Sequence, residues 1–127
     1  MKAIIAHSDA DGIISAALIH KLEGDTSIYF SSHHYLIKTL CNLLLKDYIS
    51  LKILDISPTK KSLAVASAFE EVVWIDHHET NLQEVPKNIK LINKKFASTA
   101  QLIASTFNIK DKLVEIANEI DTNSVKS

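Results

Sequence analysis

Arginine is absent from this sequence of 127 residues, and all of its fourteen basic residues are lysine. Guanidinium groups that grip phosphate through two parallel hydrogen bonds are therefore excluded within the chain. Fifteen acidic residues bring the formal net charge to −1, so no long-range positive field would gather nucleic acid around the protein. Any anion must be bound locally, by lysine, by backbone amides or by metal.

Cysteine and long apolar runs are also scarce. Cys41 is the single cysteine, which excludes an internal disulfide and is typical of a reducing compartment; we expect it to pack as a small hydrophobic residue. No run approaches the ~18 to 20 apolar residues of a membrane span, and polar side chains interrupt the first apolar run before a signal-peptide core could form. These absences favour a soluble, cytoplasmic protein without a membrane partner.

Apolar residues make up 46% of the chain, enough for one domain over residues 1–127 that buries roughly two thirds of its unfolded surface. Short apolar runs alternate with segments of helical periodicity, and no linker or repeat divides them. The expected strands are Lys2–His7, Ser27–Ser31, Leu51–Asp55, Val72–Asp76 and Ile89–Asn93. The expected helices are Gly12–Glu23, Leu36–Asp47, Thr59–Phe69 and Ser98–Thr106.

This alternation predicts an α/β fold of three layers, in which a mainly five-stranded parallel sheet carries helices on both faces. Parallel neighbours need crossover connections, and helices in those connections cover and bury the strands. Ligands of such open sheets collect beyond the carboxyl ends of the strands. A residue that directly follows an apolar run is therefore a candidate functional residue.

Acidic and imidazole side chains follow three of the expected strands. They are His7, Asp9 and Asp11 after the first strand, Asp55 after the third, and Asp76, His77 and His78 after the fourth. Carboxylates that meet at one edge of a sheet repel one another, and divalent cations relieve that repulsion. Oxygen and imidazole ligands suit manganese, magnesium or iron, whereas the lack of a thiolate cluster argues against structural zinc. Taken singly, Asp9 or Asp55 is interpreted as a helix cap or loop residue, but the convergence of three strand ends indicates a metal site.

Gly12, one of only two glycines, lies directly after Asp11, where the first strand turns into its helix. A position without a side chain lets the backbone approach a ligand closely, and the start of a helix attracts anions. We therefore expect Gly12 to lie against a bound phosphate.

Four further residues are candidate substrate contacts. His33 and His34 follow the second strand and could reach the same edge of the sheet, although a histidine pair in a loop is commonly just exposed. Ser98 and Thr99 precede the last expected helix and could hold phosphate through hydroxyls and amides. Helix capping is the alternative interpretation of that pair.

The segments HSDADGIISAAL, ILDIS and WIDHHET resemble the first three motifs of the DHH phosphoesterase superfamily, and EIANEIDTNS resembles the fourth, an aspartate that follows a helix. This superfamily includes RecJ-type exonucleases, oligoribonucleases, cyclic-dinucleotide phosphodiesterases and family II inorganic pyrophosphatases. The motifs occur in the family's order from about residue 4 to about residue 123. One departure lies in the first motif, where only Ser8 separates His7 from Asp9.

The resemblance implies two divalent metal ions, most simply Mn²⁺, with Mg²⁺ as the alternative. Asp55 matches the aspartate that bridges both ions. The remaining matches are Asp11, His77 and Asp121 for one ion and His7 with Asp9 for the other. Within the DHH triplet, Asp76 would support its neighbours without touching metal, while His78 would contact the phosphate and, with Asp55 and His77, belong to the catalytic group.

The function that the resemblance implies is hydrolysis of phosphodiester bonds in oligonucleotides or single-stranded nucleic acid by a water held between the ions. The compact HxDxDG spacing is closer to RecJ-like and archaeal-type members than to pyrophosphatases. Two alternatives stay open: a non-hydrolytic binding or assembly module, and a pyrophosphatase or small-nucleotide phosphatase. Hydrolytic members carry a second, carboxyl-terminal lobe that grips the substrate. We expect that lobe, which this sequence lacks, to come from a longer chain or a partner protein.

Overall fold

The computed structural model describes residues 1–82 and 84–126, which contain five strands and five helices. The strands are β1 (Lys2–His7), β2 (Ser27–Ser31), β3 (Ser50–Leu54), β4 (Glu71–Asp76) and β5 (Ile89–Asn93). The helices are α1 (Ala10–Glu23), α2 (Leu36–Leu44), α3 (Lys60–Ala66), α4 (Thr99–Phe107) and α5 (Lys112–Lys126). All five strands agree with the sequence prediction to within one residue, whereas α2 and α3 are shorter than predicted.

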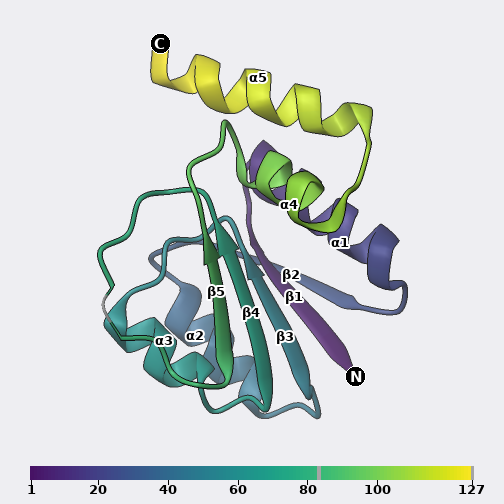
Figure 1. Ribbon diagram of the computed structural model, residues 1–127. Helices are drawn as coiled ribbons and strands as arrows, with labels where there is room; N and C mark the ends of the chain where they lie inside the picture. Colours follow the sequence, from purple (N-terminus) through teal and green to yellow (C-terminus); the bar gives the residue numbers. More distant parts are fainter. Residues whose placement is uncertain (83, 127) are drawn as a thin grey trace.

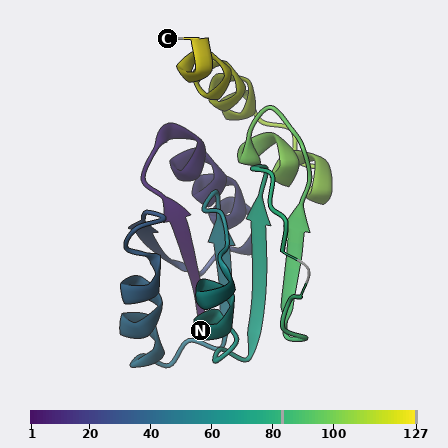
Figure 2. The same cartoon turned by 90° about the vertical axis from the view of Figure 1, so that its left-hand side faces the viewer.

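The five strands form one parallel sheet in the order β2-β1-β3-β4-β5. Helices α2 and α3 cover one face, and α1 and α4 cover the other (Figure 1). The predicted three-layer α/β class is confirmed. Helix α5 packs on α1 and α4 and lies at the end of the molecule toward which β4 and β5 point (Figures 1 and 2).

Alternation along the strands builds a core on each face of the sheet, because successive side chains point to opposite sides. Ile53 packs with the side chains of α2 and α3, while the next residue, Leu54, packs with those of α1 and α4. Trp74 is fully buried among the α2 and α3 side chains, and its indole N–H donates to the carbonyl of Ile56 at 2.7 Å.

One packing expectation is wrong. Helix α2 buries one stripe of leucines, Leu36, Leu40 and Leu43, as helical spacing requires. Cys41 falls outside that stripe and is exposed, so it does not pack as a core residue.

The strand order changes direction between β1 and β3. The chain passes from β1 to β2 on one side and then crosses back over β1 to reach β3. In open parallel sheets the crevice at such a reversal, beyond the carboxyl ends of the strands, is the usual place for a ligand. The ends of β1, β3 and β4, which carry the predicted metal ligands, are therefore adjacent.

Helix α5 differs from the expectation for Asp121. The fourth motif predicts an aspartate after a helix, but Asp121 lies inside α5, which runs to Lys126. No glycine or proline follows Asp121 to end the helix there.

No helix in the described part of the chain is long and apolar enough to cross a membrane.

Candidate metal centre

Asp11 lies in the first turn of α1 and reaches the start of α4. Its carboxylate accepts hydrogen bonds from the backbone amides of Thr99 and Ala100, each at 2.9 Å. These are amides that a helix leaves unpaired in its own first turn, where its dipole also attracts negative groups. Since Asp11 is only 2% exposed, α4 fixes its carboxylate inside the protein.

Asp55 directly follows β3 and adopts a left-handed backbone conformation with φ at 63°. That region is uncommon for any residue except glycine, and aspartate is among the few that enter it. The backbone amide of Asp55 donates to Ile75 at 2.9 Å, and its Oδ1 accepts from the hydroxyl of Thr99 at 2.9 Å. An unusual conformation held by several contacts is typical of functional positions.

His77 presents one ring nitrogen to these carboxylates. Its Nδ1 lies 3.0 Å from the carbonyl oxygen of Phe96, and because a carbonyl only accepts, Nδ1 carries the proton. Its Nε2 lies 3.6 Å from Asp11 Oδ2, 3.8 Å from Asp55 Oδ1 and 3.2 Å from Asp121 Oδ2. A histidine held through one nitrogen by a carbonyl, with the other free to coordinate, is typical of metal ligands.

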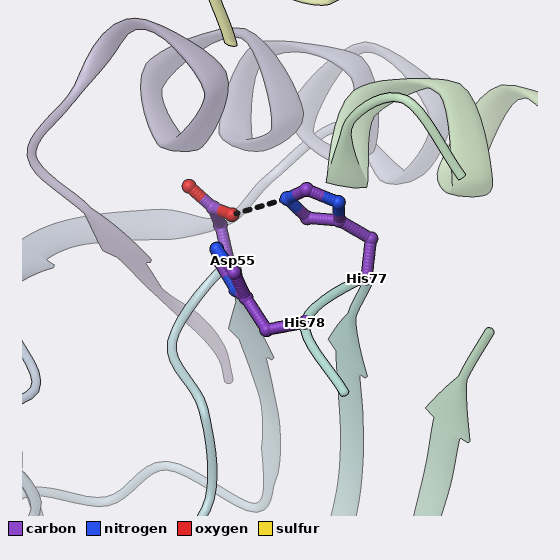
Figure 3. A group of neighbouring side chains, drawn as sticks. All are labelled: Asp55, His77 and His78. Atoms are coloured by element: carbon purple, nitrogen blue, oxygen red, sulfur yellow. Dashed lines mark ion pairs between the residues drawn. The ribbon is translucent and has the colours of Figure 1, made fainter. Parts of the chain in front are cut away.

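The ligand atoms of three groups of side chains lie within 4.8 Å of one another. The groups are His7, Asp9 and Asp55; Asp11, His77 and Asp121; and Asp55, His77 and His78. Figure 3 shows the third, with Asp55 coming from the end of β3 and both histidines from the segment after β4. Asp55 joins the groups, because its Oδ2 is 3.8 Å from His7 Nδ1 while its Oδ1 is 3.8 Å from His77 Nε2.

The electrostatics of this cluster suit divalent cations. Asp55 Oδ2 and His77 Nε2 are buried without a hydrogen-bond partner among the described residues, which costs stability unless a ligand satisfies them. Burial and the nearby charge of Asp11 raise the pKa of Asp55 to about 10, and the same two causes raise the pKa of Asp121. Oxygen and imidazole donors without thiolate fit Mn²⁺ or Mg²⁺. The residues thus fit the ions that the resemblance implies.

Asp9 serves the helix and the cluster at once. Its Oδ1 accepts from the amide of Gly12 at 2.8 Å and caps α1, and its Oδ2 lies 2.9 Å from His7 Nδ1. Burial raises the pKa of Asp9, but the hydrogen bond from the Gly12 amide and the interactions with the Asp55 and His7 side chains outweigh burial and leave that pKa below its ordinary value. Asp9 can therefore cap α1 through Oδ1 and still offer Oδ2 as a ligand atom.

Asp76, the first residue of the DHH triplet, is fully buried and contacts His78, the last. Its Oδ1 lies 2.6 Å from His78 Nδ1, and its Oδ2 accepts from the hydroxyl of Ser57 at 3.2 Å. The hydrogen bond to Asp76 raises the pKa of His78 above its usual range, against the opposing effect of burial. Asn93, at the end of β5, donates to the carbonyl oxygens of Asp76 and His78 at 2.8 and 2.6 Å.

A cavity of about 360 Å³ opens beside the cluster. Its lining includes His7, Asp9 and Asp55 together with Ser57, His78 and His33. The structure thus brings His33 to the predicted edge of the sheet. His34 is exposed and sets its ring against Tyr35, with the centroids 5.0 Å apart.

Three predicted substrate contacts have a different role in the structure. Ser98 and Thr99 are fully buried; Ser98 caps α4 by accepting from the amide of Gln101 at 3.1 Å, and Thr99 binds the carboxylates described above, so neither side chain is open to a phosphate. The amide of Gly12 is engaged by Asp9. A β-carbon at Gly12 would lie 1.9 Å from the carbonyl oxygen of His7, so the glycine is needed where α1 meets β1.

Sequence reasoning misses three residues that hold this cluster in place: Thr99 in its actual role, Phe96 and Asn93. The acceptor of Phe96 is a backbone carbonyl, for which no sequence signal exists. Asn93 follows the same rule as the other candidates, because it is the last residue of a strand and pairs in register with Asp76. Extending the rule from acidic and imidazole side chains to amides would have found it.

Comparison with known proteins adds a family match. A family model described as the DHH family, N-terminal domain, matches residues 2–125. No curated protein matches the sequence.

Several solved structures share the fold at low sequence identity. CDC45 from Entamoeba histolytica has a TM-score of 0.69 at 14% identity, and the match covers 96% of this chain and 29% of that one. An exonuclease RecJ bound to manganese has a TM-score of 0.64 at 13% identity, covering 94% and 38%. RecJ from Thermus thermophilus in complex with Mn²⁺ has a TM-score of 0.60 at 15% identity, covering 91% and 20%. This chain therefore corresponds to well under half of each of these proteins.

Proposed function

This chain belongs to the DHH family, and on that premise we propose that it is a two-metal phosphodiesterase domain acting on oligonucleotides or single-stranded nucleic acid. The observation that carries the proposal is the position of Asp55. One carboxylate oxygen faces His7 and the other faces His77, each at 3.8 Å, which is what a carboxylate shared by two ions requires.

The residues divide into two ligand sets around Asp55. His7 and Asp9 form one set, whose ring nitrogen and carboxylate oxygen lie 2.9 Å apart. The other set consists of Asp11, His77 and Asp121. We assign Mn²⁺ as the natural ion and Mg²⁺ as its substitute. Two structural neighbours described as bound to Mn²⁺ support that order.

Held by these two ligand sets, two divalent ions would lower the pKa of a bound water toward neutrality and would offset negative charge on the phosphoryl group. The chain's own residues orient the reaction. His78, held by Asp76 at 2.6 Å, has a raised pKa and lines the cavity, where a ring N–H would donate to a phosphate oxygen. His33 on the same cavity lining adds a second imidazole for the substrate.

The substrate class follows from what the domain offers and what it lacks. A cavity of about 360 Å³ is of the size that holds a single small ligand group, which suits one terminal nucleotide. Because the chain has no arginine, it offers no guanidinium group to hold the phosphates of a longer strand through two parallel hydrogen bonds. We therefore assign the remaining grip to a second lobe, carried by a longer chain or by a partner protein. The single cysteine supports a cytoplasmic setting.

The test measures metal binding and turnover on the same preparation. Wild-type protein and Asp55→Asn are titrated with Mn²⁺ by calorimetry and then incubated with single-stranded DNA, a dinucleotide, a cyclic dinucleotide and pyrophosphate. Asp47→Asn, which alters an exposed aspartate in the connection between α2 and β3, is the matched control. We expect two Mn²⁺ per chain and nucleotide release for wild type and control, and neither for Asp55→Asn.

Each other outcome identifies a different function. Turnover of pyrophosphate alone supports a pyrophosphatase. Tight Mn²⁺ binding without turnover of any substrate supports either a non-hydrolytic module or a domain that needs the second lobe, and the same assay on the longer chain or with the partner protein separates the two. Turnover by Asp55→Asn at the wild-type rate contradicts the two-metal assignment.

A further inference from the structure

Thr99 is the first residue of α4 and is fully buried. It contacts one residue from each of the first three DHH motifs. Its backbone amide donates to Asp11 Oδ2 at 2.9 Å, its hydroxyl donates to Asp55 Oδ1 at 2.9 Å, and the same hydroxyl accepts from the backbone amide of His77 at 3.3 Å. These three residues come from the segments after β1, β3 and β4.

The direction of each hydrogen bond is determined by the groups involved. A threonine hydroxyl has one hydrogen to donate and lone pairs that accept. Because the amide of His77 can only donate, it occupies a lone pair of Thr99 Oγ1, and the hydroxyl hydrogen is left for Asp55. Hence a single hydroxyl sets the orientation of the Asp55 carboxylate relative to the His77 backbone.

The contact with Oδ1 also determines what the other oxygen of Asp55 can do. With Oδ1 held by Thr99, Oδ2 stays buried, without a hydrogen-bond partner among the described residues, and directed toward His7 at 3.8 Å. The branched side chain of threonine has few rotamers in a helix, so its hydroxyl stays in place. The neighbouring amide of Ala100 adds a second hydrogen bond to Asp11 at 2.9 Å.

We propose that Thr99 is a positioning residue that aligns Asp55, the ligand shared by the two proposed sites, with Asp11 and His77 of one of them. It fixes Asp11 through its amide, Asp55 through its hydroxyl, and the His77 backbone through a lone pair of the same oxygen. The proposal rests on the proposed function insofar as these ligands hold metal. Thr99 itself touches neither ion nor substrate, since it acts through the three ligands.

The test compares variants at two adjacent buried hydroxyls of one helix start. Thr99→Val keeps the shape but removes the hydroxyl, and Thr99→Ser restores the hydroxyl. Ser98→Ala removes the cap of α4 and a hydrogen bond to Asn118 of α5, but no hydrogen bond to a proposed metal ligand. Mn²⁺ affinity is measured by calorimetry on folded protein, with circular dichroism and urea unfolding on each variant. We expect Thr99→Val to weaken Mn²⁺ binding about 10- to 100-fold, the usual effect of losing a group that orients ligands. Thr99→Ser and Ser98→Ala should bind within about 3-fold of wild type, although Ser98→Ala should be less stable.

Two results would overturn the proposal: wild-type affinity in Thr99→Val, or equal weakening in Thr99→Val and Ser98→Ala, which would reduce Thr99 to a structural residue of α4. A wild-type protein that binds no Mn²⁺ rejects the proposed function instead. The positioning role is then decided by NMR on metal-free protein. Thr99→Val should shift the carboxylate carbon of Asp55 and the amide of His77, and Ser98→Ala should shift neither; unshifted signals in Thr99→Val reject the role.

Discussion

At the scale of the residue, the burial of Asp55 suits a metal ligand but makes the carboxyl hard to ionise in the metal-free protein. Its buried carboxyl carries a pKa of about 10 in the folded protein, far above the ordinary value of 3.8. Between those values the folded state keeps a proton that the unfolded state has released. The contribution of this proton to the free energy of unfolding is therefore complete below about pH 4. It is lost as the pH rises toward 10, by up to about 1.4 kcal/mol per pH unit.

Asp55→Asn should remove this pH dependence. The amide has a similar shape to the protonated carboxyl and never ionises, so the metal-free variant should become more stable than metal-free wild type as the pH rises from 5 to 8. Urea unfolding in the presence of a chelator, repeated across that range, gives the free energy of unfolding of both proteins. Parallel pH slopes for the two would contradict the raised pKa.

Asp76 sets the protonation of His78. Replacing Asp76 with asparagine weakens the hydrogen bond and removes the negative charge that raise the pKa of His78, so the ring loses its proton at a lower pH. If the protonated ring contacts the phosphate, the decline of kcat/KM at high pH should begin at lower pH in Asp76→Asn. Ser57→Ala is the matched control, because it removes only a neutral hydrogen bond to the same carboxylate; an unchanged pH profile in Asp76→Asn would exclude His78 as the titrating group.

At the scale of the element, the junction of β1 and α1 depends on Gly12. Helix propensity alone favours alanine by about 1 kcal/mol, yet a β-carbon there would meet the carbonyl of His7 at 1.9 Å. Backbone cannot yield as a flexible side chain does, so Gly12→Ala should destabilise the protein by about 2 kcal/mol net. Urea unfolding measures this, and a stabilised variant would show that the junction relaxes freely.

The elements also show where sequence patterns succeed and where they stop. Apolar runs locate all five strands, because each strand of a covered parallel sheet must be buried. The end of α2 at Leu44 and the extension of α5 past Asp121 depend on local turn geometry and tertiary packing, which periodicity does not encode. The strand-end rule finds the acidic and imidazole residues because they follow strands. It does not select Thr99, because Thr99 begins a helix.

At the scale of the whole molecule, the proposed ligands tie four separate segments together. His7 lies at the end of β1, Asp55 after β3, His77 after β4 and Asp121 on α5. Two ions that share Asp55 would together join all four segments, and they stabilise only the folded chain because the unfolded chain does not hold these ligands together. Mn²⁺ at about 100 times its dissociation constant should add about 2.7 kcal/mol per site to the free energy of unfolding. Thermal unfolding with and without a chelator measures the effect, and an unchanged Tm would argue against an ion that joins these segments.

The order of the sequence can predict this arrangement only in part. Alternation of elements predicts a parallel sheet but not the order of its strands. The reversal between β1 and β3 is a finding of the structure, and it explains why candidates more than forty residues apart converge. Thr99 contacts residues that lie 44 and 88 positions away along the chain. These contacts depend on how the elements pack, which a single sequence does not reveal.

The position of Asp121 on the last helix affects how the protein is made. During synthesis, the residues from His7 to His78 emerge from the ribosome well before α5 does. Under the proposed assignment, the site that uses Asp121 therefore gains its last ligand only when the fourth motif has been translated.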